Sequence, residues 1–348
     1  MRRSVTIQDV ARAAQVSTAT VSRVLSTPEQ VAPATRNSVL EAIRGTGYRV
    51  NQAARNLRMK RAGAVLVLVP DLGKPFYSGI LAGISEAFAA TDYAVLISDT
   101  ETQPQGSEML GGYFRDGRID GAISLDGGMG RATLEECRSL GVDDKIVFLC
   151  EWVAGEGFSV VASDNGGGAS LAVRHLHELG HRRIAHVTGP EGNVLTTARR
   201  DGMIAERTRL GLPARSDLII RGDFSLDSGR AAAETILGME RRPTAVFCSA
   251  DMVAFGLIAR LHEGGVQVPD DISVVGFDDI EMSESYVPAL TTIRQDRKGL
   301  GRRAGELLLD RLAGNAPDDK PEPPMPVELV VRGSTAPPPR QHGAPKTR

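Results

Sequence analysis

Residues 15–25, QVSTATVSRVL, combine short hydroxyl side chains with one arginine in a pattern that suits contact with nucleic acid. Val21, Val24 and Leu25 recur at helical spacing and predict a buried stripe. The other side of this helix then carries Thr18, Ala19, Ser22 and Arg23. Small residues let a helix N-terminus approach phosphate, and arginine can offer two parallel donors to guanine. The stretch therefore predicts a DNA-reading helix, with an ordinary capped surface helix as the alternative.

The charge distribution along the chain also favours binding to DNA. The net charge is only −2, but residues 1–61 hold eleven Lys/Arg against three Asp/Glu, a net of +8, and the remainder is net −10. A small basic head followed by an acidic body suggests that only the head meets a polyanion. A basic surface that is merely solvated is the alternative.

Short helices with capping signals surround the first stretch. Thr6 can cap a first helix with Asp9 as its box-like partner, Ser17 can cap a second, and Thr35 a third that stops near residues 45–47. Two short helices joined by a tight turn predict a helix-turn-helix unit.

From Ala64 the pattern changes to apolar runs that alternate with helices. A first series has strands at 64–69, 94–98, 121–125 and 145–149, and a second at 160–163, 183–189, 245–250 and 272–277. Continuous apolar strands between helices predict parallel sheets covered on both faces. Two such series predict two α/β subdomains with a ligand cleft between them, at the carboxyl ends of the strands.

Several classes of protein are disfavoured by the sequence. Three cysteines without metal spacing, no apolar signal segment and no membrane-spanning run favour a cytoplasmic protein that is not in a membrane. His177 and His181 lie four residues apart, but Gly180 is expected to end their helix, so we expect no metal site. No motif indicates a cofactor or a nucleophile–base pair, so an enzyme is the weakest hypothesis.

TIQDVARAAQVSTATVSRVL, VAPATRNSVLEAIRGTGY and NQAARNLR resemble the headpiece of the lactose/galactose/purine repressor family, the LacI-type transcriptional regulators. The resemblance continues to about Thr335 through strings such as VPDLGKPFYSGILAGI and ISVVGFDDIEMSESYVPALTTIRQD. It implies an all-α helix-turn-helix headpiece and a periplasmic-binding-protein-like α/β body of two parallel-sheet subdomains. The expected divisions are a DNA-binding domain (1–49), a hinge helix and linker (50–61), an effector-binding and dimerisation domain (62–335) and a disordered tail (336–348).

The resemblance also implies which headpiece residues meet DNA. Thr18, Ala19 and Arg23 would face base edges, and the implied phosphate contacts are Thr6, Ser17, Thr20 and Ser22. Residues 51–59 would be a hinge helix in the minor groove, with contacts from Asn51, Ala54, Leu57 and Arg58. Leu57 is the implied wedge that opens the central base step. Two departures concern the hinge and the turn: Val50 replaces a usual proline, and Gln15 stands where many members have glycine, so it is expected to take a strained conformation.

In the body, the resemblance implies a small-molecule effector bound in the cleft. The implied contacts are Phe76, Tyr77, Asp164, Arg199, Phe224 and Asp278, with Glu151 and Gln295 as weaker candidates. For an acidic residue at a strand end, a structural cap is the alternative to a ligand contact.

Carboxylates, an arginine and aromatic rings suit a polyhydroxyl ligand. Several strings look most like the cytidine-repressor branch of the family, which favours a nucleoside over a sugar. The function expected is therefore a repressor that binds double-stranded DNA at a palindromic operator as a homodimer and responds to a small effector. A dimer rather than a tetramer is expected because residues 315–326 break any helix. The alternative is a periplasmic-type solute-binding protein, whose two lobes would give the same sequence pattern.

Overall fold

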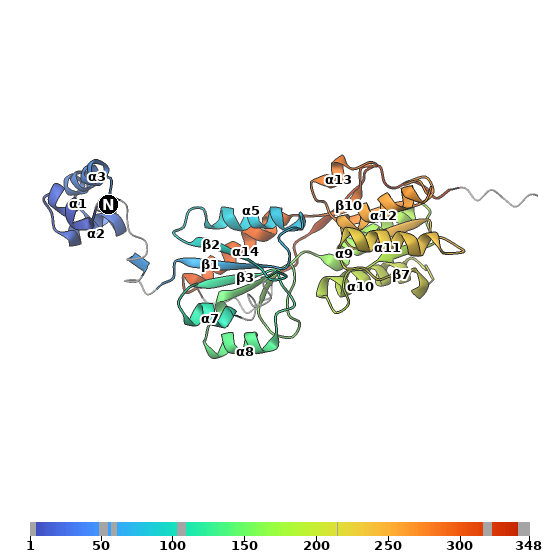
Figure 1. Cartoon of the computed structure of the whole chain (residues 1–348), viewed down its shortest axis with the longest axis horizontal. Coiled ribbons are helices and arrows are strands. Elements are labelled where there is room, and N and C mark those ends of the chain that lie inside the picture. Colours follow the sequence, from blue (N-terminus) through green and yellow to red (C-terminus); the bar gives the residue numbers. More distant parts are fainter. Residues whose placement is uncertain are drawn as a thin grey trace, which may run out of the picture. The chain divides into compact units, whose positions relative to one another are not determined.

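The computed structural model describes residues 5–48, 55–56, 61–102, 109–213, 215–315 and 322–339. The chain forms two compact units, Met1–Ala62 and Gly63–Arg348. Figure 1 shows the helices of the first unit and the two lobes of the second.

The first unit is a bundle of short helices around a small apolar core. Its elements are α1 (Ile7–Ala13), α2 (Thr18–Ser26), the 3-10 helix η1 (Pro28–Gln30) and α3 (Pro33–Thr46). Val10, Val21 and Val39 come from three different helices and are fully buried against one another. The expected helix-turn-helix is confirmed.

The capping predictions are confirmed for two helices and wrong for the third. The Thr6 N–H and hydroxyl both donate to Asp9 Oδ2, at 2.9 and 2.8 Å. Ser17 Oγ accepts the Thr20 N–H at 3.1 Å. Thr35 is not a cap, because α3 begins two residues earlier at Pro33. Proline suits the first turn of a helix, since its fixed φ is helical and its missing N–H would have no partner there.

Gln15 takes the left-handed conformation that its position in the turn requires, with φ of +55°. The prediction of a strained residue at this point is therefore confirmed, since left-handed backbone costs most residues other than glycine about 1 kcal/mol. The turn places Val16 so that its N–H bonds the Ala11 carbonyl at 3.0 Å.

The first lobe of the second unit is a five-stranded, fully parallel sheet in the order β2-β1-β3-β4-β5. Its strands are β1 (Ala64–Val69), β2 (Ala94–Asp99), β3 (Gly121–Ser124), β4 (Ile146–Leu149) and β5 (Ser159–Val161). Its helices are α5 (Phe76–Phe88), α7 (Leu110–Arg115), α8 (Arg131–Ser139), η2 (Asp143–Lys145) and α14 (Arg297–Leu312). Every residue of β1 is buried, as its unbroken apolar run predicts.

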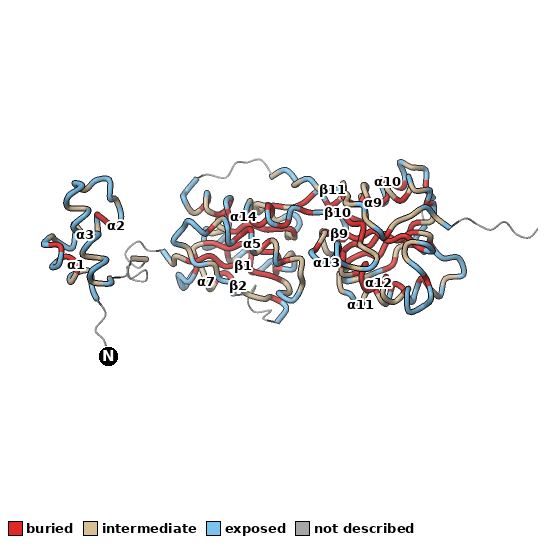
Figure 2. The backbone as a smooth tube through the Cα atoms, turned by 90° about the horizontal axis from the view of Figure 1, so that it is seen from above, coloured by how far each residue is buried: buried red, intermediate tan, exposed pale blue. Residues whose placement is uncertain are grey.

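The second lobe is a six-stranded sheet in the order β11-β10-β9-β8-β6-β7, in which only β11 is antiparallel. Its strands are β6 (Ile184–Val187), β7 (Ile219–Ile220), β8 (Ala245–Cys248), β9 (Ser273–Asp278), β10 (Thr291–Gln295) and β11 (Val327–Val330). Its helices are α9 (Asn165–Glu178), α10 (Val194–Arg209), η3 (Ser216–Leu218), α11 (Leu226–Leu237), α12 (Asp251–Glu263) and α13 (Met282–Ser285). Figure 2 shows the buried strands at the centre of both lobes.

Two features of the body differ from the expectation. The strand predicted at 160–163 was placed in the second series, but β5 pairs with β4 and completes the first sheet. The chain also returns to the first lobe after β10, where α14 packs against α5, as Figure 1 shows. Leu300, Ala304 and Leu308 of α14 are fully buried in the core of the first lobe. The lobes are therefore joined by several chain crossings.

The chain remains ordered past the point where the tail was expected to begin. Ala336 donates its N–H to Ser273 Oγ at 3.0 Å, and its carbonyl lies 2.9 Å from His181 Nε2. Residues 340–348 lie outside the described part of the chain. Among the residues described, no helix is long and apolar enough to span a bilayer.

Candidate functional site

The outer face of α2 gathers the residues that the sequence assigned to base contact. Thr18, Ala19 and Arg23 are exposed, whereas Val21 and Val24 point into the core. A shallow hollow is lined by Ile7, Thr18, Ala19, Ser22, Arg23, Ser26 and Thr27. The short side chains thus leave room beside Arg23, and an extended guanidinium can reach into a groove from this face.

The remaining headpiece positions divide between the described and the undescribed parts of the chain. Ser17 and Thr20 stand at the first turn of α2, and Thr6 at the start of α1, where free N–H groups favour anions. The hinge positions Asn51, Ala54, Leu57 and Arg58 lie outside the described residues.

The second unit contains a cleft between its lobes, with about 880 Å³ of empty space including the part open to solvent. This size suits a small organic ligand. The first lobe contributes Pro70, Lys74, Phe76, Tyr77, Asp126 and Glu151. The second lobe contributes Pro190, Asn193, Leu195, Arg199, Asp223, Phe224, Ala250, Met252, Asp278 and Ile280.

Arg199 is the central cation of the cleft. It lies on α10 with only 2% of its surface exposed. Its Nε donates to Asn165 Oδ1 at 2.9 Å, and its Nη1 donates to the Ser249 carbonyl. Its guanidinium carbon also sits 3.8 Å from the centre of the Phe277 ring. Burial lowers the pKa of Arg199, and the Asp278 carboxylate opposes that shift. These contacts fix the guanidinium before any ligand arrives.

Asp278 is the partner of Arg199 on the cleft wall. It ends β9 with a left-handed φ of +119°, and its Oδ1 lies 3.9 Å from Arg199 Nη2. Gln295 Nε2 donates to the same oxygen at 2.8 Å. Burial raises the pKa of Asp278, while Arg199 and Gln295 lower it. A ligand hydroxyl could bridge the gap between carboxylate and guanidinium, because a direct bond between them is too long.

Aromatic rings line the cleft from both lobes. Phe224 follows β7 in a left-handed conformation, with φ of +67°, and its ring centre is 5.8 Å from the Arg199 guanidinium. Phe76 and Tyr77 begin α5 opposite, with ring centres 5.3 Å apart. Flat faces on two sides suit a sugar ring or a base.

The structure does not bring Asp164 into the cleft, which corrects that assignment. Asp164 is exposed and caps α9, where its Oδ1 accepts the Gly167 N–H at 2.8 Å. The structural alternative for an acidic residue at a strand end therefore holds here. The other five predicted contacts, Phe76, Tyr77, Arg199, Phe224 and Asp278, all line the cleft.

Sequence reasoning missed several polar residues of the cleft wall. Lys74, Asp126, Asn193 and Asp223 each follow a parallel strand, the signal that could have identified them. Glu151, a weaker candidate, also lines the cleft. Burial raises the pKa of Glu151, whereas a hydrogen bond from Asn193 of the other lobe lowers it.

His181 lies outside the cleft and is fully engaged in structure. It is 1% exposed and lies within 3.1 Å of Thr244 Oγ1, Ser273 Oγ and the Ala336 carbonyl. In the described ranges, no three His, Cys, Asp or Glu side chains are placed to hold a metal ion.

His186 on β6 gives a testable pH dependence of stability. Its ring stacks on Phe247 at 4.7 Å, and its Nδ1 donates to the Phe247 carbonyl at 3.0 Å. Burial lowers the pKa of His186 from 6.5 to about 4. Between about pH 6.5 and 4, His186 is therefore protonated in the unfolded chain but neutral in the folded chain. We expect the His186 contribution to the free energy of unfolding to fall by about 3 kcal/mol as pH drops through this window, while buried acids with raised pKa values, such as Asp278, contribute in the opposite direction.

Urea unfolding at several pH values would measure this slope. His186→Gln should lose the His186 contribution, seen as a difference in slope from wild type, and His175→Gln, which alters a half-buried histidine bonded to Thr335, should differ far less from wild type. An unchanged slope in His186→Gln would show that the acid sensitivity has another source.

Two family models match this chain. Residues 6–51 match the family described as "Bacterial regulatory proteins, lacI family", and residues 173–335 match "Periplasmic binding protein-like domain". The chain is 38% identical over 331 residues to the HTH-type transcriptional repressor CytR of Escherichia coli (strain K12), a match that covers 95% of this chain and 96% of that protein. It is 33% identical over 335 residues to the HTH-type transcriptional regulator CelR of Thermobifida fusca, over 95% of this chain and 96% of that protein.

Solved structures show the same architecture. A lac repressor dimer bound to operator and the anti-inducer ONPF aligns with a TM-score of 0.81 and 31% identity, over 96% of this chain and 100% of that chain. A complex of the regulator CelR with cellobiose aligns with a TM-score of 0.72 and 31% identity, over 95% and 99% of the two chains.

Proposed function

The chain belongs to the lacI family of bacterial regulatory proteins, and from that premise we propose that a nucleoside, held between its two lobes, sets its affinity for an operator. Membership makes the chain a DNA-binding repressor with an effector-binding domain. The body alone would also fit a solute-binding protein, but residues 6–51 carry the regulator headpiece. CytR and CelR are transcriptional regulators, which favours regulation over catalysis for this chain.

The observation that carries the proposal is the pairing of Arg199 with Asp278 in a cleft that aromatic rings line from both lobes. A ribose hydroxyl can accept from the guanidinium and donate to the carboxylate, and a base can lie against Phe224. The 38% identity to CytR favours a nucleoside over a sugar. The cellobiose complex of CelR makes a sugar the second candidate.

Calorimetric titration of the full chain against ribonucleosides, pentoses and hexoses tests the ligand class. We expect heat of binding from at least one nucleoside and a weaker response from the sugars. Binding of a sugar with no heat from any nucleoside would reverse this preference.

At the DNA end, we propose that Arg23 reads bases, that Thr6, Ser17, Thr20 and Ser22 contact phosphates, and that Thr18 and Ala19 face base edges. Residues 51–59 would form the hinge, with Leu57 opening the central step and Asn51, Ala54 and Arg58 beside it. Because the side chains at 18 and 19 are short, much of the preference for DNA sequence should come from Arg23 and from DNA deformability. Selection of bound DNA should thus give tolerant half-sites and a strongly preferred centre. A featureless centre would count against the Leu57 wedge.

A homodimer is proposed, since one short helix reads few base pairs and the lac repressor structure is a dimer on operator. The edge strand β2 exposes Leu96 (43%) and Ile97 (48%), an apolar edge that a second copy could cover. Sedimentation of wild type at micromolar concentration should give a dimer, and Leu96→Lys should give mostly monomer.

The matched control for this prediction is Leu140→Lys, which charges a similarly exposed leucine (37%) on the end of α8. It should remain dimeric. A wild-type tetramer would overturn the proposed dimer, and a dimer that survives Leu96→Lys unchanged would overturn this interface.

A further inference from the structure

Arg297 reaches from one lobe of the body to the other. It is the first residue of α14 and is 9% exposed. Its Nη1 donates to the Pro75 carbonyl of the first lobe at 3.3 Å. Its Nη2 donates to the Asp279 carbonyl at 3.2 Å and to Glu281 Oε1 at 2.9 Å, both in the second lobe. One guanidinium therefore has acceptors on both sides of the cleft.

At the first-lobe end, Arg297 is built into the start of α5. Pro75 immediately precedes Phe76 and Tyr77, which line the cleft. Gly79 of α5 faces the arginine so closely that a Cβ there would lie 3.2 Å from Arg297 Cβ and 3.5 Å from Cζ. Farther along, Gly83 lets the backbones of α5 and α14 touch. Arg297 and α5 must consequently move as one body.

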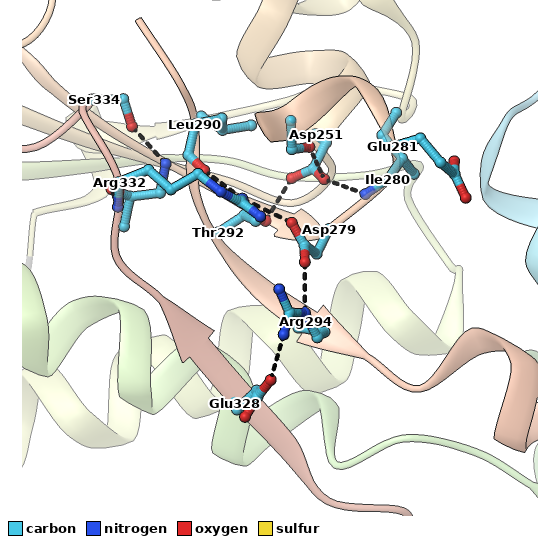
Figure 3. Close-up of polar contacts among 12 residues, drawn as sticks. Asp251, Asp279, Ile280, Glu281, Leu290, Thr292, Arg294, Glu328, Arg332 and Ser334 are labelled. Atoms are coloured by element: carbon cyan, nitrogen blue, oxygen red, sulfur yellow. Dashed lines mark hydrogen bonds and ion pairs between the residues drawn. The ribbon is translucent and has the colours of Figure 1, made fainter. Parts of the chain in front are cut away.

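At the second-lobe end, Arg297 meets a turn that is held rigidly. Asp251 Oδ2 accepts the Ile280 N–H at 2.9 Å and the Ser283 hydroxyl at 2.7 Å. Figure 3 shows Asp279 between Arg332 and Arg294. Its Oδ1 lies 2.7 Å from Arg332 Nη1, and its Oδ2 lies 2.6 Å from Arg294 Nε.

The rigid turn starts at the ligand-facing residue. Asp278 and Asp279 both have left-handed backbone, with φ of +119° and +53°. Such conformations persist only where the surroundings fix them, and here the Asp251 and Asp279 contacts do so. A shift of Asp278 on ligand binding would thus be passed to the Asp279 carbonyl and to Glu281.

We propose that Arg297 is the interlobe positioning residue that ties the Asp278–Glu281 turn to α5, so that lobe arrangement and operator affinity depend on this guanidinium. The proposal rests on the proposed function for its regulatory part. A bond between lobes that survives in only one arrangement shifts the balance between arrangements by the free energy of that bond. Lysine could not replace this arginine fully, because it lacks the planar fork that reaches several acceptors.

The test compares Arg297→Ala with Lys298→Ala in the full chain. Lys298 is the next residue of α14, and its ion pair with Glu86 at 2.9 Å stays within the first lobe. Spin labels on Glu135→Cys (α8) and Thr235→Cys (α11) report the distance between lobes. The three native cysteines are buried, so labelling is selective. In a dimer, a tenfold excess of unlabelled protein leaves most labelled subunits paired with unlabelled ones, so that the measured distances lie within one subunit.

We expect Arg297→Ala to broaden or displace the interlobe distance distribution, Lys298→Ala to match wild type, and Arg297→Lys to lie between. A purely local structural role would lower the melting temperature and leave the distribution unchanged. That result, or an equal shift in Lys298→Ala, would overturn the proposal.

A second measurement separates this inference from the proposed function. On the operator recovered by selection, Arg297→Ala should change affinity by about tenfold and Lys298→Ala by less than about twofold. A changed distance distribution with unchanged operator affinity would overturn the regulatory part. Failure to recover any operator would count against the proposed function, while the distance measurement would still decide the role of Arg297.

Discussion

An Arg199→Ala variant is expected to bind its effector about 100-fold more weakly than wild type and to lose the effect of that ligand on operator affinity. The buried guanidinium is the central cation of the cleft, and it is held by Asn165, Ser249 and the Phe277 ring. Its removal takes away a ligand donor and leaves Asp278 buried without its counter-charge. Calorimetric titration gives the ligand affinity, and operator titration with and without ligand gives the response.

Two further variants make this prediction specific. Asp278→Asn keeps the shape and removes the charge, so it should also weaken ligand binding without the instability of a cavity. Arg200→Ala is the matched control, because Arg200 is the next residue of α10 and pairs on the surface with Asp201. It should behave as wild type. The cleft assignment fails if Arg199→Ala and Asp278→Asn still respond fully to ligand.

The same variants should leave the operator affinity of the ligand-free protein within about twofold of wild type, since binding and regulation are linked only through differential affinity for two lobe arrangements. A ligand with equal affinity for both lobe arrangements does not shift the balance between them, so it no longer changes the affinity for operator. This outcome applies equally to an inducer and to a corepressor.

The cleft shows which parts of a site a sequence can predict. The family resemblance assigned Arg199 and Asp278 to the effector site, and both line the cleft. Asp164 had the same local signal as Asp278, a carboxylate after an apolar strand, yet it caps α9. Asp278 differs in its left-handed φ and in its contacts, since its carboxylate accepts a hydrogen bond from Gln295 on β10 and pairs with Arg199 on α10. Local spacing does not contain those contacts.

The fold shows the same limit. The apolar run of β1 was sufficient to predict a buried parallel strand. The apolar spacing of Leu300, Ala304 and Leu308 is typical of a packed helix, but it does not say which lobe α14 covers. That choice depends on close backbone contacts with α5 at Gly83 and Gly301. For the same reason Arg297, the link between the lobes, could not be found from the sequence.

At the other end of the chain, Arg23→Ala is expected to weaken binding to the selected operator by about 2 to 6 kcal/mol in a dimer, because two bidentate base contacts are lost at about 1 to 3 kcal/mol each. Affinity for random DNA should fall far less, since non-specific binding depends on phosphate contacts. Competition binding on operator and random duplexes at one salt concentration measures both.

The control for Arg23 is Arg44→Ala, an exposed arginine near the end of α3 and outside the hollow on α2. Its loss should weaken operator and random DNA by a similar small factor. If Arg23→Ala also lowered both affinities equally, Arg23 would be a phosphate contact. Specificity would then have to come from DNA deformability and the hinge alone, because Thr18 and Ala19 are too short to make strong base contacts. The ratio of the two losses therefore distinguishes a reading helix from one that only positions the headpiece.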